Sequence, residues 1–342
     1  MINDCKNCGG NVNFSPKDKG NVCENCGSIF AVKYDSNVVK KDFAEATKLN
    51  KISSNADICN VKCSSCGAIM VMHKRDIKSV CPYCDSATIG EVGQQKMLDI
   101  DAIVPFAFNK EDALLIFQQK VSSNFFANKK VFKGLQKEDI KGVYVNAFVF
   151  DLNTNIEYKG TFSYTETYKN SKGESKTRTV YKHVSGSYNR FFNNLTVEAN
   201  SNLNQNEMMQ ILPYDYSKNV KFDADFTHGY AFEHHNEVFD DCLVKAEGVM
   251  KEIVKKELLK KYNCDRVVSL DLNISYNDRK YNYCLLPVYF VNKKHKDKTY
   301  NVLMNGQTGK LSSLPKSVAK ILLVIFMILG FVAGVVSFAM LF

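Results

Sequence analysis

The sequence of 342 residues lacks the short motifs with which many enzymes bind nucleotides or catalytic metals. Neither GxxxxGK[ST] nor GxGxxG, the glycine-rich patterns that hold phosphate groups, occurs in it. The HExxH pattern of zinc proteases is absent as well. The best local cluster is Glu233, His234, His235 and Glu237, with His228 upstream, and we interpret it as the polar start of a helix. No convergent acid, base or nucleophile is recognisable, so we expect a protein that is not an enzyme.

The N-terminus also lacks the apolar core of a secretory signal peptide. We therefore expect a reducing compartment, where cysteines bind metal more readily than they form disulfides. This matters because the chain has 12 cysteines, nine of them within the first 84 residues. Cys59 is the odd one among the nine, either a spare thiol or a competing ligand. Cys242, Cys264 and Cys284 lie in apolar surroundings and are interpreted as buried thiols.

The other eight cysteines form two quartets with one spacing: a CxxC pair, fourteen residues, and a second CxxC pair. The quartets are Cys5, Cys8, Cys23 and Cys26, then Cys63, Cys66, Cys81 and Cys84. Each pair places two thiolates on one tight turn, and two facing turns supply the four sulfurs of a tetrahedral zinc site. Gly9 and Gly67 follow the first pair of each quartet, where the backbone often needs a positive φ. The pattern predicts two structural zinc ions.

The last 22 residues, 321–342, contain no charge. As a helix they would span a hydrocarbon core of roughly 30 Å. Lys310, Lys316 and Lys320 precede them, so the positive-inside rule predicts a single-pass, tail-anchored cell-membrane protein with its N-terminal bulk in the cytoplasm. The same helix predicts contact with membrane lipid, and its GxxxG pair, Gly330 and Gly334, predicts possible homo-oligomers through this helix.

The remaining chain predicts an α+β fold dominated by antiparallel sheet. We divide it into a zinc ribbon at 1–35, a linker at 36–58, a second ribbon at 59–90, an α+β domain at 100–315 and a transmembrane helix at 318–342. Apolar periodicity predicts helices at 110–124, 206–212 and 231–262. Alternation predicts strands at 143–152, 156–168, 177–188, 267–276, 281–291 and 300–304.

The net charge of each ribbon indicates whether it binds protein or nucleic acid. The first ribbon has four lysines and four acidic residues, and the second has four basic and two acidic residues. A zinc ion with four thiolates adds −2, so the folded ribbons carry about −2 and 0. Phosphate binding depends on a basic surface, which neither ribbon has overall. We therefore expect protein partners, although His73, Lys74 and Arg75 leave nucleic-acid binding by the second ribbon as an alternative.

Several short runs resemble a recurrent signature. They are LPVYF (286–290), YNV (300–302), NGQTGK (305–310) and Pro315, with VPF (104–106), KEDA (110–113), GVY (142–144), FD (150–151) and LPYD (212–215). The signature is that of bacterial membrane-anchored proteins with a transcription-factor-IIB-type zinc ribbon, found largely in low-GC Gram-positives. The resemblance covers nearly the whole chain, but Asn146 and Tyr289 stand where that family has a proline-like residue and a tryptophan.

That resemblance implies no catalytic residue. The resemblance implies association with membrane-stress proteins of the phage-shock type and with flotillin-like SPFH proteins. Some members are labelled primosomal restart helicase-like because of their cysteine pairs, but this chain has no helicase nucleotide loop. We therefore expect a zinc-binding adaptor that docks protein partners at the inner face of the membrane. The alternatives are a membrane-tethered nucleic-acid-binding protein and, more distantly, an enzyme in the central domain.

Overall fold

The structure is a computed structural model that describes residues 4–48, 58–73, 81–87, 89–92, 99–200, 205–233 and 237–339. The fold is mixed α and β, with two sheets in which most strands are antiparallel, as the sequence predicts. The small sheet consists of β1 (Val12–Ser15), β2 (Gly20–Cys23) and β3 (Ile29–Ala31), in that order.

Three long strands form the trunk of the second sheet, in the order β10–β9–β13. They are β9 (Ile140–Lys169), β10 (Ser175–Glu198) and β13 (Arg266–His295). The predicted break between 152 and 156 does not occur, because residues 153–155 stay paired with both neighbouring strands. The predicted strands 267–276 and 281–291 are likewise continuous, because the chain between them forms a bulge near residue 277 in β13 and pairing with β9 continues past it. Ladder bonds to two neighbours therefore extend these strands beyond their predicted bounds.

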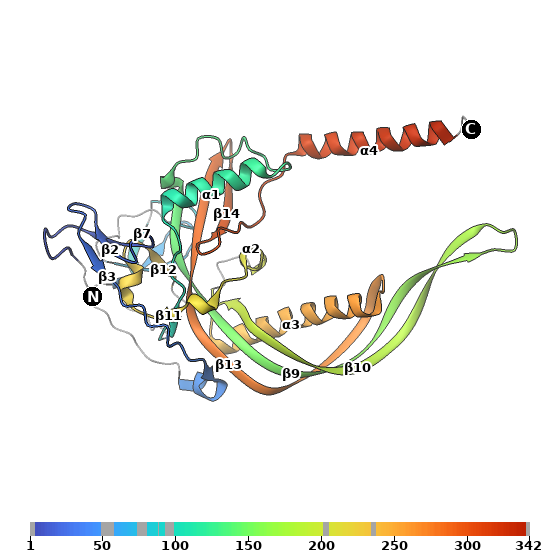
Figure 1. The fold of residues 1–342 in the computed structure, drawn as a ribbon, viewed down its shortest axis with the longest axis horizontal. Coiled ribbons are helices and arrows are strands. Elements are labelled where there is room, and N and C mark those ends of the chain that lie inside the picture. Colours follow the sequence, from blue (N-terminus) through green and yellow to red (C-terminus); the bar gives the residue numbers. More distant parts are fainter. Residues whose placement is uncertain are drawn as a thin grey trace.

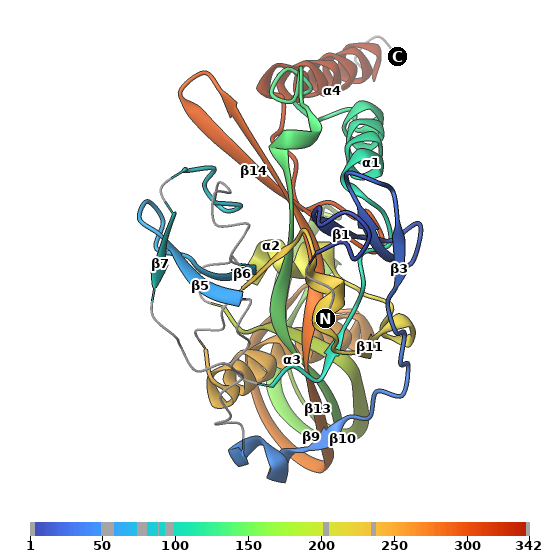
Figure 2. The same cartoon turned by 90° about the vertical axis from the view of Figure 1, so that its left-hand side faces the viewer.

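Shorter strands complete the large sheet. They are β4 (Lys41–Asp42), β5 (Ile58–Cys63), β6 (Ile69–His73), β7 (Ile89–Val92), β8 (Ala102–Ile103), β11 (Val220–Lys221), β12 (Ala231–Glu233) and β14 (Lys298–Asn305). Along the sheet the order is β11–β8–β13–β9–β12–β6–β5–β7. Figure 2 shows β1–β3 and β5–β7 on opposite sides of the trunk. Both cysteine-bearing modules therefore attach to one scaffold.

Two of the predicted helices begin where expected, and one does not. α1 (Lys110–Ser123) starts after Asn109, whose side chain accepts a bond of 2.8 Å from the Asp112 amide. α2 spans Gln205–Ile211. α3 spans Phe239–Tyr262, so the predicted start at residue 231 is wrong. Ala231 and Phe232 instead pair with β9 as part of β12. Short 3-10 turns lie at Phe43–Lys48, Lys137–Asp139, Tyr216–Lys218 and Ala224–Thr227.

α3 covers the concave face of the curved trunk (Figure 1). Its buried side chains Cys242, Ala246, Met250, Val254 and Leu258 recur at helical spacing and pack on aromatic residues of β9 and β13. A second cluster lies beneath α1, and a third lies between the trunk and α2. Beyond the end of α3 the β9–β10 hairpin continues alone as a two-stranded arm (Figure 1).

The C-terminal helix requires a correction. α4 spans Val318–Ala339, and its apolar side chains between Leu322 and Val332 are exposed except for Val324, which is half-buried. Nevertheless, none of the helices in the described ranges is both long and apolar enough to cross a membrane. This finding contradicts the predicted transmembrane helix at 318–342 and the single-pass localisation. Helix association through Gly330 and Gly334 stays a prediction.

Candidate metal centres

The four CxxC turns share one backbone geometry. In each turn the amide four residues after the first cysteine donates to that cysteine's carbonyl, over 2.8–3.0 Å. The donors are Gly9, Gly27, Gly67 and Asp85, with φ between 61° and 78°. The positive φ expected at Gly9 and Gly67 is confirmed. Asp85 adopts the same left-handed conformation without being a glycine, which is why the sequence pattern did not reveal it.

These turns bring four sulfurs together in each quartet. Within each quartet all ligand atoms lie within 4.8 Å of one another. The closest pairs are Cys5–Cys26 at 3.4 Å, Cys8–Cys23 at 3.5 Å, Cys63–Cys84 at 3.6 Å and Cys66–Cys81 at 3.7 Å between Sγ atoms. Zinc–sulfur bonds of about 2.3 Å in a tetrahedron place sulfurs about 3.8 Å apart. Both quartets therefore have the donor type, number and spacing that fit a tetrahedral metal ion.

Burial is the same in both clusters. The first cysteine of every turn is buried, and the second is exposed or, for Cys84, half-buried. None of the cysteines described here forms a disulfide. Each metal would therefore lie at the surface of its module, with two sulfurs anchored inside and two facing outward.

In the first cluster, hydrogen bonds stabilise the thiolate form of Cys26. The Cys26 Sγ lies 3.1 Å from the Ser28 hydroxyl, which itself accepts a bond of 2.8 Å from the Asn7 amide. Bonds from Ser28 lower the pKa of Cys26 to about 6. In the second cluster burial raises the pKa of Cys81. A bound cation would favour the thiolate at every position, because ligating thiols are deprotonated.

The first module is fixed to the body of the protein by aromatic contacts. Phe14 of β1 is buried in the main core, and its ring centroid lies 5.2 Å from that of Phe226. Its amide also donates to the carbonyl of His228 over 3.0 Å. Tyr34, just after β3, packs edge-on against Phe226 at 5.0 Å. The module is therefore held to the domain through β1 and the residues after β3, while Cys8 and Cys26 stay exposed.

The second module is fixed by backbone pairing as well. Val71 of β6 pairs with Phe232 of β12, which pairs with β9 in turn. Next to Cys81, the side-chain amide of Asn292 donates to the Pro82 carbonyl over 2.7 Å. Tyr83 packs against Phe290 with centroids 4.9 Å apart. The turn that carries Cys81 and Cys84 thus rests directly on β13.

Among the residues that the structure describes, the other candidates do not converge on a third centre. His234 and His235 lie outside the described residues, as do Lys74, Arg75 and the side chains of Cys59 and His73. His228 is buried, with Nε2 3.5 Å from Asp225 in the 3-10 turn before β12. Glu237 forms an ion pair with Lys245 at 2.5 Å. Cys242 and Cys284 are buried, as expected, and Cys264 is only half-buried.

The buried carboxyl of Glu198 was not predicted from the sequence. Glu198, at the end of β10, is 2% exposed, and neither of its carboxyl oxygens has a hydrogen-bond partner. Burial raises its pKa to about 8, opposed by the charge of Lys245 and supported by that of Glu237. These groups lie 39 and 47 residues away along the chain, so no local pattern could have revealed the cluster.

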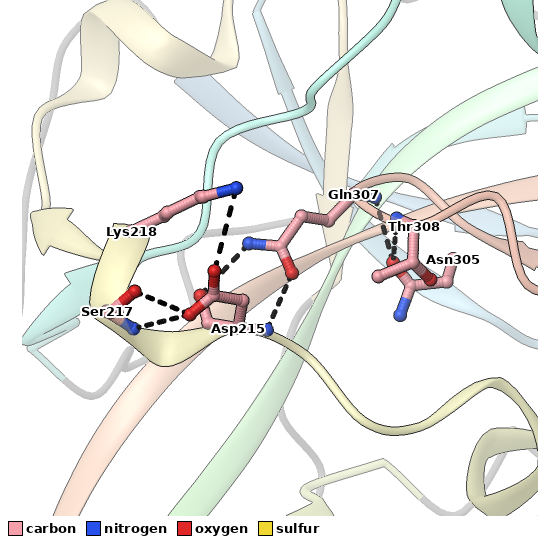
Figure 3. Close-up of polar contacts among 6 residues, drawn as sticks. All are labelled: Asp215, Ser217, Lys218, Asn305, Gln307 and Thr308. Atoms are coloured by element: carbon pink, nitrogen blue, oxygen red, sulfur yellow. Dashed lines mark hydrogen bonds and ion pairs between the residues drawn. The ribbon is translucent and has the colours of Figure 1, made fainter.

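Two of the short runs, LPYD (212–215) and NGQTGK (305–310), form a clasp (Figure 3). The Gln307 side chain accepts from the Asp215 amide at 2.7 Å and donates to the Asp215 carbonyl at 3.0 Å. Asn305 Oδ1 accepts from the amides of Gln307 and Thr308, and its Nδ2 donates to the Ile211 carbonyl. The side-chain amides of Asn305 and Gln307 therefore form their hydrogen bonds with backbone groups. The clasp joins two loops that are distant in the sequence, and these two side chains have a structural role.

Three of the other runs, VPF (104–106), GVY (142–144) and LPVYF (286–290), pack against one another through their aromatic residues. Phe106 stacks on Tyr230 with centroids 4.3 Å apart and contacts Tyr144 and Tyr289 within 5 Å. A Cβ at Gly142 would lie 2.6 Å from the Tyr230 ring. The aromatic cluster therefore accounts for Gly142 and the large aromatic side chains around it in terms of packing alone.

Comparison with known proteins adds one distant relative. No protein-family model matches the chain, and no solved structure matches it. The chain is 21% identical over 214 residues to the "Uncharacterized protein YdjG" of Bacillus subtilis (strain 168). The aligned region covers 62% of this chain and 62% of the relative, so it spans about three fifths of the relative's length. The relative brings no activity or ligand to this chain.

Proposed function

We propose that the protein is a non-enzymatic adaptor in which two structural zinc ions shape two docking modules for protein partners. The observation that carries the proposal is the pair of four-sulfur clusters, each built on two turns of the same geometry. Zinc is the metal that most often takes four cysteines in a tetrahedral structural site. With all four positions filled by sulfur, such an ion has no open position for substrate, so its role is to fold its module.

The attachment of the modules supports docking. Each is fixed to the scaffold and still has ligand cysteines exposed to solvent, Cys8 and Cys26 in the first module and Cys66 in the second. A rigid surface loses little conformational entropy on binding, which favours recognition of a folded partner. The charges of about −2 and 0 for the zinc-loaded ribbons favour a protein partner over a polyanion.

The first test is metal content. The purified full-length chain is expected to contain two zinc ions, one for each cluster. Replacing Cys23 and Cys81 together with serine removes one buried ligand from each site and should release both ions. Cys264→Ser, which changes a half-buried thiol outside the clusters, is the matched control and should retain both. Full zinc content in the double variant would contradict the assigned ligands.

The second test concerns partners. Tagged full-length protein is captured from extracts of its own host after nuclease treatment. Partners that survive nuclease, persist with Cys264→Ser and are lost with the double cysteine variant would support docking by the modules. Loss of every partner on nuclease treatment would refute the proposal and favour a nucleic-acid-binding protein. Far-UV circular dichroism of each variant shows whether the domain remains folded.

A further inference from the structure

The β9–β10 arm has an open edge. β10 pairs with β9 from Ser175 to Phe192 without interruption, and it pairs with no other strand in the part of the chain that the structure describes. Its second row of backbone donors and acceptors is therefore unpaired. Most side chains from Ser175 to Asn189 are exposed, and the arm projects past α3 (Figure 1). An open edge of this kind is a template on which another strand can pair.

All the cations of β10 lie on one face of the arm. They are Lys176, Arg178, Lys182 and Arg190, every one at an even position of an uninterrupted ladder. Side chains alternate between faces along a strand, so even positions share a face. Lys182 pairs with Phe162, which is buried in the α3 cluster, and this identifies the face as the one on which α3 packs.

From residue 175 to residue 191, the opposite face of β10 carries no lysine, arginine, aspartate or glutamate. Its residues from 175 to 191 are Ser175, Thr177, Thr179, Tyr181, His183, Ser185, Ser187, Asn189 and Phe191. The acidic residue of β10 is Glu198, which is buried at the far end of the strand. The open edge thus has a basic face and a hydroxyl-rich and aromatic face.

Contacts across the arm orient the cations without neutralising them. Glu166 is shared by Arg178 at 3.3 Å and Lys182 at 3.8 Å, so one carboxylate faces two cations. Arg178 lies 5.6 Å from the centre of the Tyr168 ring, and Lys182 lies 4.7 Å from that of Tyr164. Lys176 has no ion pair among the residues the structure describes. An excess of positive charge therefore remains beside the open edge.

We propose that the open edge of β10 binds an extended acidic segment of a partner protein by strand addition. The backbone ladder would provide affinity, and alternate side chains would provide specificity. Carboxylates at every second position would lie beside Lys176, Arg178 and Lys182, where cross-strand ion pairs form. The intervening residues would lie beside the threonines and Tyr181, which favours β-branched or aromatic side chains there.

Two other occupants fit less well. A two-stranded ribbon enters the major groove of DNA through a free face, but α3 covers part of the basic face of this arm, and Glu166 lies on that face as well. A second copy of this chain would need a segment with acidic residues at three alternate positions, and the sequence contains none. A partner protein with such a segment is therefore the occupant that this charge pattern favours.

The inference extends the proposed docking function to a site apart from the cysteine clusters. Its test uses the full-length, zinc-loaded protein and a short fluorescent peptide in which glutamate alternates with threonine and valine. Fluorescence anisotropy should show binding to this peptide. It should show roughly tenfold weaker binding to a peptide of the same composition with all glutamates in one block, because three carboxylates can no longer share a face.

Matched variants separate strand addition from general electrostatics. The triple change K176Q, R178Q and K182Q should weaken binding of the alternating peptide by about tenfold. The control K159Q, K169Q and K172Q removes the same charge from the other face and the turn, and should keep affinity within about twofold. Both proteins should retain their metals, so a failure here is distinguishable from a failure of the zinc adaptor.

Three results would overturn the inference. Equal weakening by the two triple variants, or equal binding of the two peptides, would reduce the effect to net charge. Displacement of the peptide by a short DNA duplex that binds more tightly would assign the arm to nucleic acid. Self-association that disappears in the K176Q, R178Q and K182Q variant, measured by analytical ultracentrifugation without peptide, would assign the edge to a second copy.

Discussion

Replacement of Glu198 by glutamine should stabilise the protein increasingly as the pH rises. The carboxyl is buried without hydrogen-bond partners, and burial raises its pKa from 4.5 to about 8. In the folded protein it therefore keeps its proton up to about pH 8, whereas in the unfolded chain it releases the proton near pH 4.5. The unfolded state binds fewer protons between these values, so the wild-type protein loses stability as pH rises through them.

The size of the effect follows from proton linkage. Each pH unit within that window changes the free energy of unfolding by about 1.4 kcal/mol for one proton. Between pH 5.5 and 7.5 the wild-type protein should therefore lose about 2.5 kcal/mol through Glu198 alone. Glutamine has a similar shape and does not titrate. The difference in unfolding free energy between Glu198→Gln and wild type should rise by that amount across the same range.

Urea unfolding at several pH values between 5.5 and 7.5 measures this difference. The chain has no tryptophan, so tyrosine fluorescence or far-UV circular dichroism follows the transition. Comparison at each pH cancels titration of the cysteine clusters, which both proteins share. Glu138→Gln changes an exposed carboxyl and is the control, with a difference near zero throughout. A difference for Glu198→Gln that does not change with pH would refute the reasoning.

Two further substitutions test the packing and the capping. Gly142→Ala places a Cβ 2.6 Å from the Tyr230 ring, so the free energy of unfolding should fall by about 1–3 kcal/mol. An unchanged urea midpoint would show that the ring can move aside. Asn109→Ala removes the side chain that accepts the Asp112 amide at the start of α1, and should cost about 1 kcal/mol, whereas Asn109→Asp should keep most of the stability. Equal losses for the two Asn109 variants in thermal unfolding would contradict the capping role.

The success of sequence reasoning depended on how local each feature is. The start of α1 at Lys110 was predictable because Asn109 and the following apolar spacing lie within a few residues. The start of α3 was not, because Ala231 and Phe232 pair as a strand with partners from distant parts of the chain. Glu198 was invisible in the sequence because its environment comes from α3 and the loop before it. The C-terminal segment was misjudged because the absence of charge is only one of the requirements for a membrane-spanning helix.

The sequence by itself determined the two cysteine quartets and the left-handed turns at Gly9 and Gly67, because CxxC geometry is set by a few consecutive residues. It also determined the overall class of the fold, since alternation and helical periodicity are local signals. Tertiary structure alone decided which surfaces are free. Pairing between distant segments joined the predicted strands into the long strands β9, β10 and β13. Tertiary packing also left one or two cysteines of each quartet exposed and the basic edge of β10 without a neighbouring strand beyond α3. Edges and faces are defined by what packs beside them, and those neighbours come from far along the chain.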